Sequence, residues 1–457
     1  MKIRHLAVGV LVCASITFAS VAKTSAQDDL VPLIVELLRD SDKDIRALAF
    51  EQVRTEAPGE TATKKFAALL PDLPTGTQVG LLSALADRGD KVAASAVRDL
   101  LANSKDEQVR VASIKSLGGL GEAADLPSLV KFVSTGTPAE QAAARRSLVV
   151  LPGEQASAAM AAELSKAQVP VRVMLMEVLT TRRARNTAPA ILNAATDDDP
   201  DVRRAAMAAL GQLGASEHVP GMVQAVLKAE RGRERDAAEK AIMLVCHRTA
   251  DPKKRAQPLL DAMDALSKSD HAILLSALGR VGGSAALVEI EAVLSDSKLH
   301  TAGLRALYNW PDASIAFRLL ELARIEEKAA HRRTALRAMI RVAPLPDDRS
   351  DQHRLDLLRT AMAMCGEEAD RLWVLDRARA VRSVQALRFI KPYMNQSPYT
   401  EQACLAVVDL AHHSGLREAN KAEFHRALDQ VILISKNATV VDRAQRYKKG
   451  ETWVKPG

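Results

Sequence analysis

The sequence has few aromatic residues for its length. Its 457 residues include only seven Phe, four Tyr and three Trp, although 47% of all residues are hydrophobic. Alanine and leucine supply most of that apolar share, and long alternating stretches of β-branched or aromatic residues are missing. This composition disfavours a β-rich fold, and the apolar content is too high for a disordered chain. We therefore predict an all-α protein.

Motifs of common enzymes and cofactor sites are missing as well. The chain has no Cys-x-x-Cys-His, Gly-x-Ser-x-Gly or His-Glu-x-x-His motif and no glycine-rich phosphate loop. Cys246-His247 and His412-His413 are adjacent pairs, whereas two ligands on one helix face lie about three or four residues apart. The sequence thus predicts no catalytic residues, no cofactor and no metal.

The first 26 residues differ from the rest of the chain. Lys2 and Arg4 precede an uncharged apolar run, residues 6–22, and small residues suited to cleavage follow at 24–26. We predict a signal peptide over residues 1–26 and an exported protein, periplasmic or secreted, with the exact cleavage site left open. The alternative is a membrane anchor, because the run of about 17 residues is at the lower limit for spanning a bilayer.

The chain after the predicted cleavage is expected to be soluble and not held together by disulfides. No later run approaches spanning length, so we predict no stable membrane insertion. Three cysteines follow, Cys246, Cys365 and Cys404, an odd and sparse set that is no disulfide framework. Whether one disulfide forms among them is left open.

The sequence repeats itself at intervals of about 32 residues. Residues 109–121, VRVASIKSLGGLG, match residues 202–214, VRRAAMAALGQLG, and residues 45–53 are a further copy. A regular period of this length indicates a repeat array instead of several globular domains. With the position of Leu210 as anchor, twelve copies are found, at Val53, Leu85, Leu117, Leu148, Leu179, Leu210, Ile242, Leu278, Leu307, Met339, Leu375 and Val407.

Each copy has two helical halves. In the sixth copy, residues 188–196 and 202–213 carry apolar residues at helical spacing, and an acidic turn, residues 197–200, separates them. Two short amphipathic helices cannot bury their apolar faces alone, but stacked copies share a continuous core. Thin layers packed by alanine, leucine and valine also explain the scarcity of aromatic rings.

These residues resemble HEAT repeats, in particular the short bacterial type first associated with phycobilisome lyases. The motif is Asp-x-x-Val-Arg-x-Ala-Ala-x-x-Ala-Leu-Gly-x-Leu-Gly. It is matched best in residues 30–54, 92–121 and 188–214, and the match is weak from about residue 218 onward. The resemblance implies an α-solenoid, a right-handed superhelix with the second helix of each pair on the concave side. We predict a solenoid of about twelve helix-turn-helix repeats over residues 27–416, then a C-terminal capping helix, residues 421–434, and basic tail within 417–457.

Charge argues against nucleic acid as a ligand. Residues 27–416 hold 51 basic and 51 acidic residues, so the predicted solenoid is neutral, and DNA or RNA binding needs uncompensated cations. Five arginines recur at one repeat position and are interpreted mainly as structural partners of the acidic turns, the alternative being an anion-binding stripe. They are Arg46, Arg110, Arg172, Arg203 and Arg235.

Aromatic placement indicates where a protein partner would bind. Every Tyr and Trp lies beyond residue 307, and binding hot spots favour Trp, Tyr and Arg. The alternative is that these rings fill gaps where the repeat pattern has decayed, and the tail either docks on its own solenoid or presents its rings to a partner. The candidate partner-binding residues are Tyr308, Trp310, Arg182, Arg183, Tyr447 and Trp453.

The sequence therefore predicts an exported scaffold that mediates protein–protein interaction and has no catalytic activity of its own. HEAT arrays are mostly protein-binding scaffolds, but a fold does not fix a task. The competing prediction is an enzyme or enzyme accessory subunit, lyase-like, with its site on the concave face. A purely structural role in the cell envelope is a third possibility.

Overall fold

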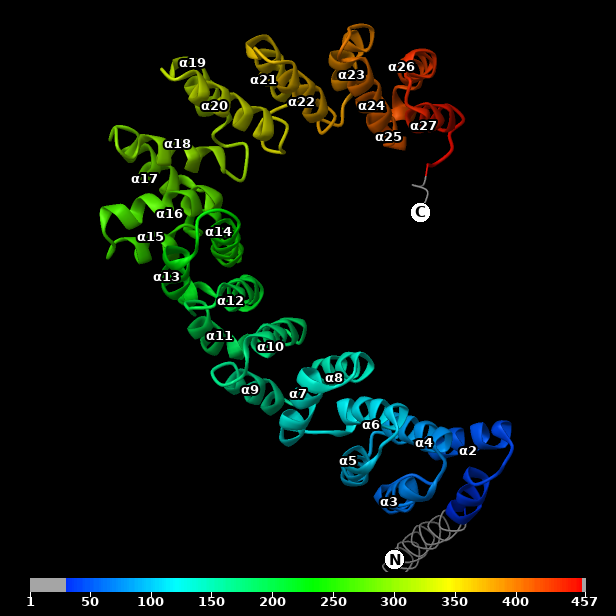
Figure 1. Cartoon of the computed structure of the whole chain (residues 1–457). Coiled ribbons are helices and arrows are strands. Elements are labelled where there is room, and N and C mark those ends of the chain that lie inside the picture. The colour runs from blue at the N-terminus through cyan, green and yellow to red at the C-terminus, as the bar shows by residue number, and fades with distance from the viewer. Residues whose placement is uncertain (1–29, 454–457) are drawn as a thin grey trace, which may run out of the picture. The chain divides into compact units, whose positions relative to one another are not determined.

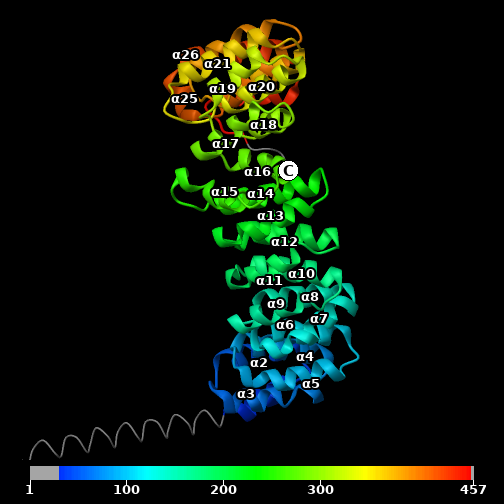
Figure 2. The same cartoon turned by 90° about the vertical axis from the view of Figure 1, so that its left-hand side faces the viewer.

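The described part of the chain is built of helices and short turns alone. The computed structural model describes residues 30–453, and over this range it contains α-helices and 3-10 turns and no strand (Figures 1 and 2). The all-α prediction is confirmed. The predicted signal peptide, residues 1–26, lies outside the described residues. In the described residues, no helix is both long enough and apolar enough to cross a bilayer.

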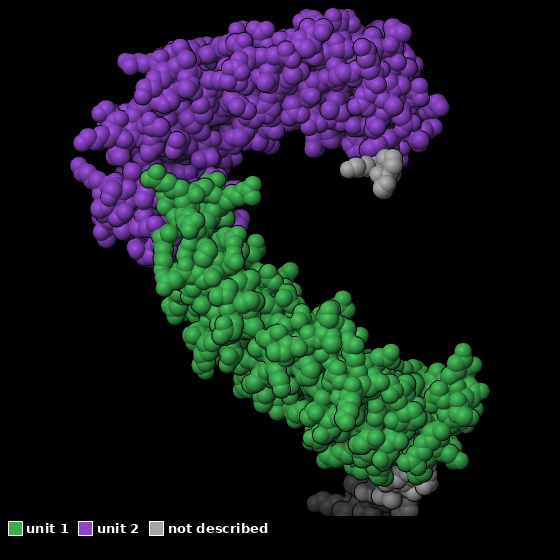
Figure 3. Space-filling model, in the orientation of Figure 1, with its two compact units in different colours: residues 1–214, 228–237 green, residues 215–227, 238–457 purple. Residues whose placement is uncertain are grey.

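The chain divides into two compact units, coloured separately in Figure 3. Unit 1 comprises residues up to Gly214 together with Lys228–Ala237, and unit 2 comprises Ala215–Leu227 and the chain from Ala238 onward. Each unit is a stack of helix pairs with its own core, so each is described by itself.

In unit 1, the helices alternate between two layers. A first helical stretch, residues 30–38, precedes α2. The even-numbered layer contains α2 (Lys43–Thr55), α4 (Thr75–Arg88), α6 (Glu107–Leu120), α8 (Pro138–Val150), α10 (Val169–Thr181) and α12 (Pro200–Leu213). The odd-numbered layer contains α3 (Glu60–Ala67), α5 (Ala94–Asn103), α7 (Leu126–Thr135), α9 (Glu154–Glu163) and α11 (Ala188–Ala194). The 3-10 turns η1 (Leu70–Asp72), η2 (Lys91–Ala93), η3 (Ala123–Asp125) and η4 (Arg185–Thr187) connect them.

Unit 2 continues the same alternation. Its first two helices, α13 (Val219–Lys228) and α14 (Arg233–Cys246), have a few residues assigned to unit 1. The others are α15 (Gln257–Met263), α16 (Lys268–Val281), α17 (Ser284–Leu294), α18 (His300–Tyr308), α19 (Ala316–Ile325), α20 (Ala329–Val342), α21 (Asp351–Met364), α22 (Glu368–Ala378), α23 (Val384–Ile390), α24 (Thr400–Ala411), α25 (Ser414–Ala419), α26 (Lys421–Ile434) and α27 (Ala438–Lys448). Its 3-10 turns are η5 (Ser216–His218), η6 (Pro252–Lys254) and η7 (Lys391–Asn395).

The repeat period read from the sequence is confirmed by burial. All twelve anchor residues, from Val53 to Val407, are 0% exposed. One anchor lies on each even-numbered helix from α2 to α24, so every repeat places the same position in the core. Successive even helices pack against each other from α2 to α12 in unit 1 and from α16 to α26 in unit 2, so the anchors within each of these stacks form a continuous apolar layer.

The local sequence determines where α12 begins and ends. At the start of α12 the Asp199 carboxylate accepts hydrogen bonds from the N–H groups of Asp201 and Val202, at 2.8 and 3.2 Å. Pro200 follows, at a helix position where a missing N–H costs nothing. At the other end, the N–H of Gly214 donates to the Leu210 carbonyl. The acidic turn of the motif is therefore a helix cap.

Small residues let neighbouring even helices approach closely. A Cβ atom added to Gly118 on α6 would lie 2.9 Å from the Cα atom of Ser147 on α8. The Ser147 hydroxyl donates to the Ile114 carbonyl at 2.8 Å, so the buried serine is satisfied across the same interface. A larger residue at Gly118 would force the two helices apart.

The C-terminal segment docks on unit 2. The helix predicted for residues 421–434 is confirmed by α26, with the same bounds. A further helix, α27, packs against α24 and α26 and buries Val440, Ala444 and Tyr447. The pair α26–α27 thus covers the apolar face that the last repeat would otherwise leave exposed.

The three described cysteines are free thiols within the core. Cys246, Cys365 and Cys404 are buried and unpaired with each other. Burial raises the pKa of Cys246 to about 12, so its thiol stays protonated at neutral pH. No disulfide forms among these three residues, and the question that the sequence left open is settled.

The stacking of even helices predicts unequal costs for two substitutions on α8. Leu148→Ala removes a fully buried anchor and should lower the free energy of unfolding by about 3 kcal/mol, since the cavity is closed in by neighbouring helices. Val150→Ala, two residues along the same helix, changes a side chain that is 62% exposed and should cost less than about 0.5 kcal/mol. Urea unfolding of both variants measures the difference, and equal costs would contradict the burial pattern.

Candidate functional site

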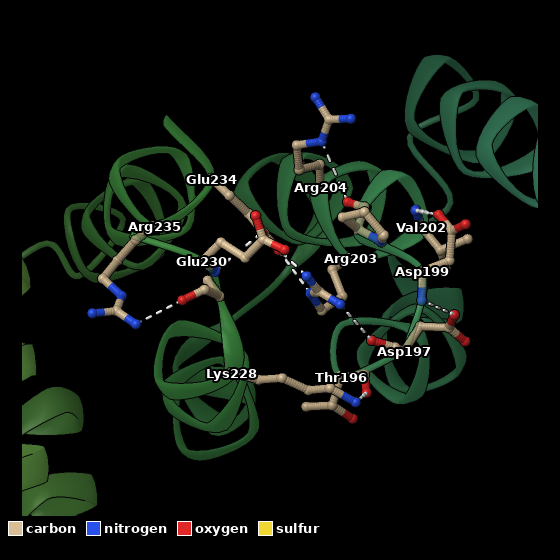
Figure 4. Close-up of polar contacts among 12 residues, drawn as sticks. Thr196, Asp197, Asp199, Val202, Arg203, Arg204, Lys228, Glu230, Glu234 and Arg235 are labelled. Atoms are coloured by element: carbon tan, nitrogen blue, oxygen red, sulfur yellow. Dashed lines mark hydrogen bonds and ion pairs between the residues drawn. The ribbon is translucent and has the colours of Figure 1, made fainter. Parts of the chain in front are cut away.

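The arginine that recurs in the motif closes the acidic turn. In Figure 4, Arg203 reaches back from α12 and donates from Nη1 to the carbonyls of Asp197 and Asp198, at 3.0 and 2.8 Å. Its Nε and Nη2 atoms bind Glu234 at 2.7 and 3.1 Å. Both side chains are almost fully buried, with 7% and 10% exposed. The guanidinium therefore joins a turn to the next repeat.

Other repeats use the same bond to the carbonyl six residues back. These carbonyls lie at or just after the end of the preceding helix, which is odd-numbered in every case but that of Arg417, and free carbonyls and the helix dipole there attract a cation. The structural interpretation of the arginine row is supported, although Arg172 differs and binds the Asp197 carboxylate at 2.6 Å instead. The pairs are Arg46 with Asp40, Arg110 with Ser104, Arg235 with Ala229, Arg332 with Glu326, Arg371 with Cys365 and Arg417 with Ala411.

A second arginine series, which sequence reasoning missed, closes the ends of the even helices. Arg182 follows α10 and donates from Nη1 to the carbonyls of Leu148 and Val149 on α8, at 3.0 and 2.8 Å. The same bond to the end of the preceding even helix is made by Arg88, Arg341 and Arg377. The number of residues between the anchor and the arginine differs among these repeats, so the arginines are not part of the repeat motif.

Two of the candidate partner-binding residues are the neighbours Arg182 and Arg183. The Arg182 guanidinium is engaged with carbonyls, and burial lowers its pKa, so it supports the scaffold, but the side chain is only half-buried and lines the same depression as Arg183. Partner binding by Arg182 stays a prediction. Arg183 is exposed, with a left-handed backbone φ of 55°, and lines an open depression together with Arg185. Partner binding by Arg183 stays a prediction.

Tyr308 and Trp310, at the end of α18, turn inward. The Trp310 ring is 1% exposed, and its Nε1 donates to the Ser314 hydroxyl at 2.8 Å. The surface position expected for Trp310 is wrong, because Gly282 at the end of α16 has no side chain and leaves room for the ring and Pro311. Tyr308 is half-buried, and its hydroxyl donates to the His331 carbonyl at 3.3 Å.

Tyr447 is also a core residue, contrary to its expected place on a partner surface. Only 1% of it is exposed, and its hydroxyl lies 2.9 Å from His412 Nδ1. Arg417 and Arg443 place their guanidinium groups over its ring, at 5.5 and 5.9 Å. The prediction was wrong because the tail forms a helix pair that needs its own apolar residues for docking.

Trp453, like Tyr308, is a candidate aromatic that the structure leaves partly exposed. The Arg443 guanidinium lies 5.1 Å from its ring, and its Nε1 donates to the Asp442 carboxylate at 3.2 Å. The ring lines an open depression of about 580 Å³ at the ends of α22 and α24 and beside α27. The depression is lined by Asp376, Arg377, Arg379, Ala380, Arg382, Asp409, His412, His413, Arg443 and Trp453, and we call this set the basic depression.

Cations outnumber anions in the basic depression. Its four arginines face two aspartates, and both carboxylates are already paired. Arg379 and Arg443 bind Asp409, the latter at 2.6 Å, and Arg379 binds Asp376 at 2.8 Å. Arg382 is exposed and has no carboxylate partner among the described residues. Burial, with Arg382 and His412 nearby, lowers the pKa of His413, so this imidazole is neutral at physiological pH.

A second cluster of ionisable groups lies elsewhere in unit 2. His300 at the start of α18, Glu326 after α19 and His331 on α20 bring their ligand atoms within 4.8 Å of one another. Glu326 and His331 come from neighbouring elements, whereas His300 lies 26 residues before Glu326, and the three match no motif, so no sequence pattern pointed to them. Among the described residues, this set is the one whose atoms could hold a metal ion.

Comparison with known proteins agrees with the repeat assignment. A family model described as HEAT repeats matches residues 63–149 and 157–243. These two blocks are HEAT repeats, and the described fold is an α-solenoid. The match ends at residue 243, in the region where the motif weakens. No curated protein matches the sequence.

Some solved structures resemble the chain at low sequence identity. One is the karyopherin Kap121p bound to the extreme C-terminus of the protein phosphatase Cdc14p, with 13% identity, a TM-score of 0.46, and coverage of 89% of this chain and 54% of that chain. Another is the complex of CpcE and CpcF of phycocyanin lyase from Nostoc sp. PCC7120, with 18% identity, a TM-score of 0.26, and coverage of 52% of this chain and 94% of that chain. The chain thus spans about half the length of the karyopherin, and neither likeness bears on its function.

The buried Arg203–Glu234 pair predicts a large and pH-dependent cost for one substitution. Arg203→Met leaves the buried Glu234 carboxylate without its partner and should lower the free energy of unfolding by about 3 kcal/mol. Arg204→Met, at the adjacent residue, breaks an exposed pair with Asp201 and should cost less than about 0.5 kcal/mol. Urea unfolding at neutral pH compares the two variants.

Acid should reduce the cost of Arg203→Met to the part that comes from the lost bonds to the Asp197 and Asp198 carbonyls. Burial disfavours the charged form of Glu234, but hydrogen bonds from Arg203 and the Glu230 N–H outweigh it and lower the pKa of Glu234. The stabilisation from the ionised carboxylate is therefore present above the unfolded pKa of about 4.3 and is lost as the pH falls through the lower folded value. A cost that does not shrink below that pH would speak against this pair.

Proposed function

We propose that the protein is an exported scaffold that binds an acidic segment of a protein partner in the basic depression, without catalytic activity of its own. The observation that carries this proposal is the convergence of Trp453 with Arg382 and Arg443 in one open depression. Trp and Arg are the residue types that dominate binding hot spots. The excess of cations favours a partner with carboxylates.

The surrounding contacts support a preorganised binding surface. Asp409 holds both Arg379 and Arg443, and Arg377 donates to the Arg341 carbonyl at the end of α20. Arg377 and Arg379 lie at the end of α22, beside the fully buried anchor Leu375. Arg443 lies on α27, which is held by the buried Tyr447, so core packing fixes the backbone beneath all three arginines. A partner would then bind with little loss of side-chain freedom on the scaffold side.

The same contacts favour binding over catalysis. A general base needs a free carboxylate or imidazole, whereas Asp376 and Asp409 are paired with arginine and His412 is hydrogen-bonded to Tyr447. The thiols that could act as nucleophiles are buried elsewhere in the core. In the basic depression, His413 is the remaining neutral imidazole, and the residues that line the depression include no unpaired carboxylate and no thiol with which it could form a catalytic pair.

Export is the part of the proposal that rests on sequence alone. The charged start, the apolar run over residues 6–22 and the small residues at 24–26 support cleavage before Gln27. Amino-terminal sequencing of the protein recovered from the exported fraction tests it. A chain that keeps Met1 and stays in the cytoplasmic fraction would contradict export.

Partner binding should depend on Trp453 and Arg382. Trp453→Ala and Arg382→Glu should each weaken binding of the captured partner at least tenfold, because they remove an aromatic anchor or reverse a charge. Lys131→Glu makes a charge reversal at an exposed residue on α7 and should leave binding unchanged. Capture from the exported fraction by the mature chain, followed by titration of the purified partner, measures all three.

Three outcomes of this experiment would overturn the proposed site. Equal affinities for the Trp453→Ala variant and the unchanged protein would place the partner elsewhere. A captured protein with no acidic segment, or one equally sensitive to Lys131→Glu, would contradict charge complementarity at the basic depression.

A further inference from the structure

Two histidines and a glutamate from three different elements meet in unit 2. The Nε2 atom of His300 lies 3.2 Å from Oε2 of Glu326, and Nδ1 of His331 lies 3.5 Å from the same oxygen. The two imidazole rings are tilted by 38°, with centroids 6.0 Å apart. Three ligand atoms therefore face one small space, and no element contributes more than one of them.

The separations match what a zinc ion requires of its ligands. Zinc–nitrogen and zinc–oxygen bonds of about 2.0–2.1 Å at tetrahedral angles place neighbouring ligand atoms about 3.3 Å apart. The two distances to Glu326 Oε2 bracket this value. The remaining separation, between ligand atoms of the two imidazoles, is within 4.8 Å, and the His331 ring would have to turn toward the ion to shorten it.

The hydrogen bond on the far side of His300 favours the tautomer that a metal needs. Its Nδ1 lies 2.7 Å from the Leu294 carbonyl, at the end of α17. A carbonyl only accepts, so Nδ1 carries a proton. Nε2 donates to the Glu326 carboxylate when the ring is charged, and in the neutral ring it has a lone pair that can bind a metal ion. A backbone carbonyl that holds the second nitrogen is the usual support of a metal-binding histidine.

Burial of the Glu326 carboxylate is costly unless a cation lies beside it. The Glu326 side chain is only 8% exposed, whereas those of His300 and His331 are 30% and 17% exposed. A buried carboxylate needs a positive partner. The partly exposed histidines leave an opening through which an ion can enter and a water molecule can complete the coordination.

We propose that His300, Glu326 and His331 form a binding site for one divalent transition metal ion, Zn²⁺. Two imidazole nitrogens and one carboxylate oxygen are a ligand set suited to zinc. The site would tie α18, α19 and α20 together, three elements of consecutive repeats, at a place where the repeat motif is weak. It is independent of the basic depression and of the proposed function.

Protons compete with the metal at this site. The Leu294 carbonyl and the Glu326 carboxylate raise the pKa of His300, with the charge of Lys328 opposing them. Tyr308, whose hydroxyl donates to the His331 carbonyl, stays protonated because burial raises its pKa. Binding should therefore weaken as the pH falls and the imidazoles become charged.

Titration of the mature full-length chain, freed of metal by chelation, with ZnCl₂ at pH 7.5 tests the proposal. Isothermal calorimetry should show one Zn²⁺ per chain, and Glu326→Gln and His300→Gln should each reduce the affinity at least tenfold. His353→Gln, at an exposed histidine on α21, is the matched control and should bind as the unchanged protein does. Bound Co²⁺ should give the strong visible absorption of a tetrahedral site in the unchanged protein only.

Thermal unfolding separates metal binding from a structural role of the three side chains. Zn²⁺ should raise the Tm of the unchanged protein and of His353→Gln, but not of Glu326→Gln. If Zn²⁺ leaves the Tm unchanged in every variant, the cluster is a hydrogen-bonded triad and the proposal is wrong. A stoichiometry that Glu326→Gln and His300→Gln do not reduce would likewise overturn it.

Discussion

The structure depends on burial between successive even-numbered helices. A single helix pair of this chain has too little apolar surface for a core of its own, so each anchor residue reaches full burial only against its neighbours. Small residues such as Gly118 set how closely α6 and α8 approach. The scarcity of aromatic residues follows from this constraint, because thin layers packed by leucine, valine and alanine leave little space for rings.

Arginine supplies the polar half of the same arrangement. One series, represented by Arg203, binds the carbonyls after an odd helix, and a second, represented by Arg182, binds the carbonyls at the end of the preceding even helix. Helix ends carry unpaired carbonyls and a partial negative charge, and a short-helix solenoid has many such ends. The basic depression differs from both series, because Arg379 and Arg443 there bind the carboxylate of Asp409. Cations still outnumber anions in the depression, and a partner can bind them.

The sequence predicted the structural features that recur from repeat to repeat. It did not predict side-chain contacts that occur at one place only. The anchors and the extent of α26 follow from spacing alone, because each repeats a local rule. Trp310 and Tyr447 were wrongly assigned to a partner surface because Trp and Tyr are common residue types at binding surfaces. In the structure their rings are buried and fill space in the least regular repeats. The His300–Glu326–His331 cluster depends on how three elements pack, which no local pattern records.

If each repeat is held by its neighbours alone, damage to one anchor should stay local. Hydrogen exchange of the Leu148→Ala variant measures this most directly, residue by residue. The account predicts faster exchange in α6, α8 and α10 and unchanged protection in α2 and in unit 2. Equal loss of protection across the whole chain would contradict it, because the core would then be one cooperative body instead of a stack of neighbours.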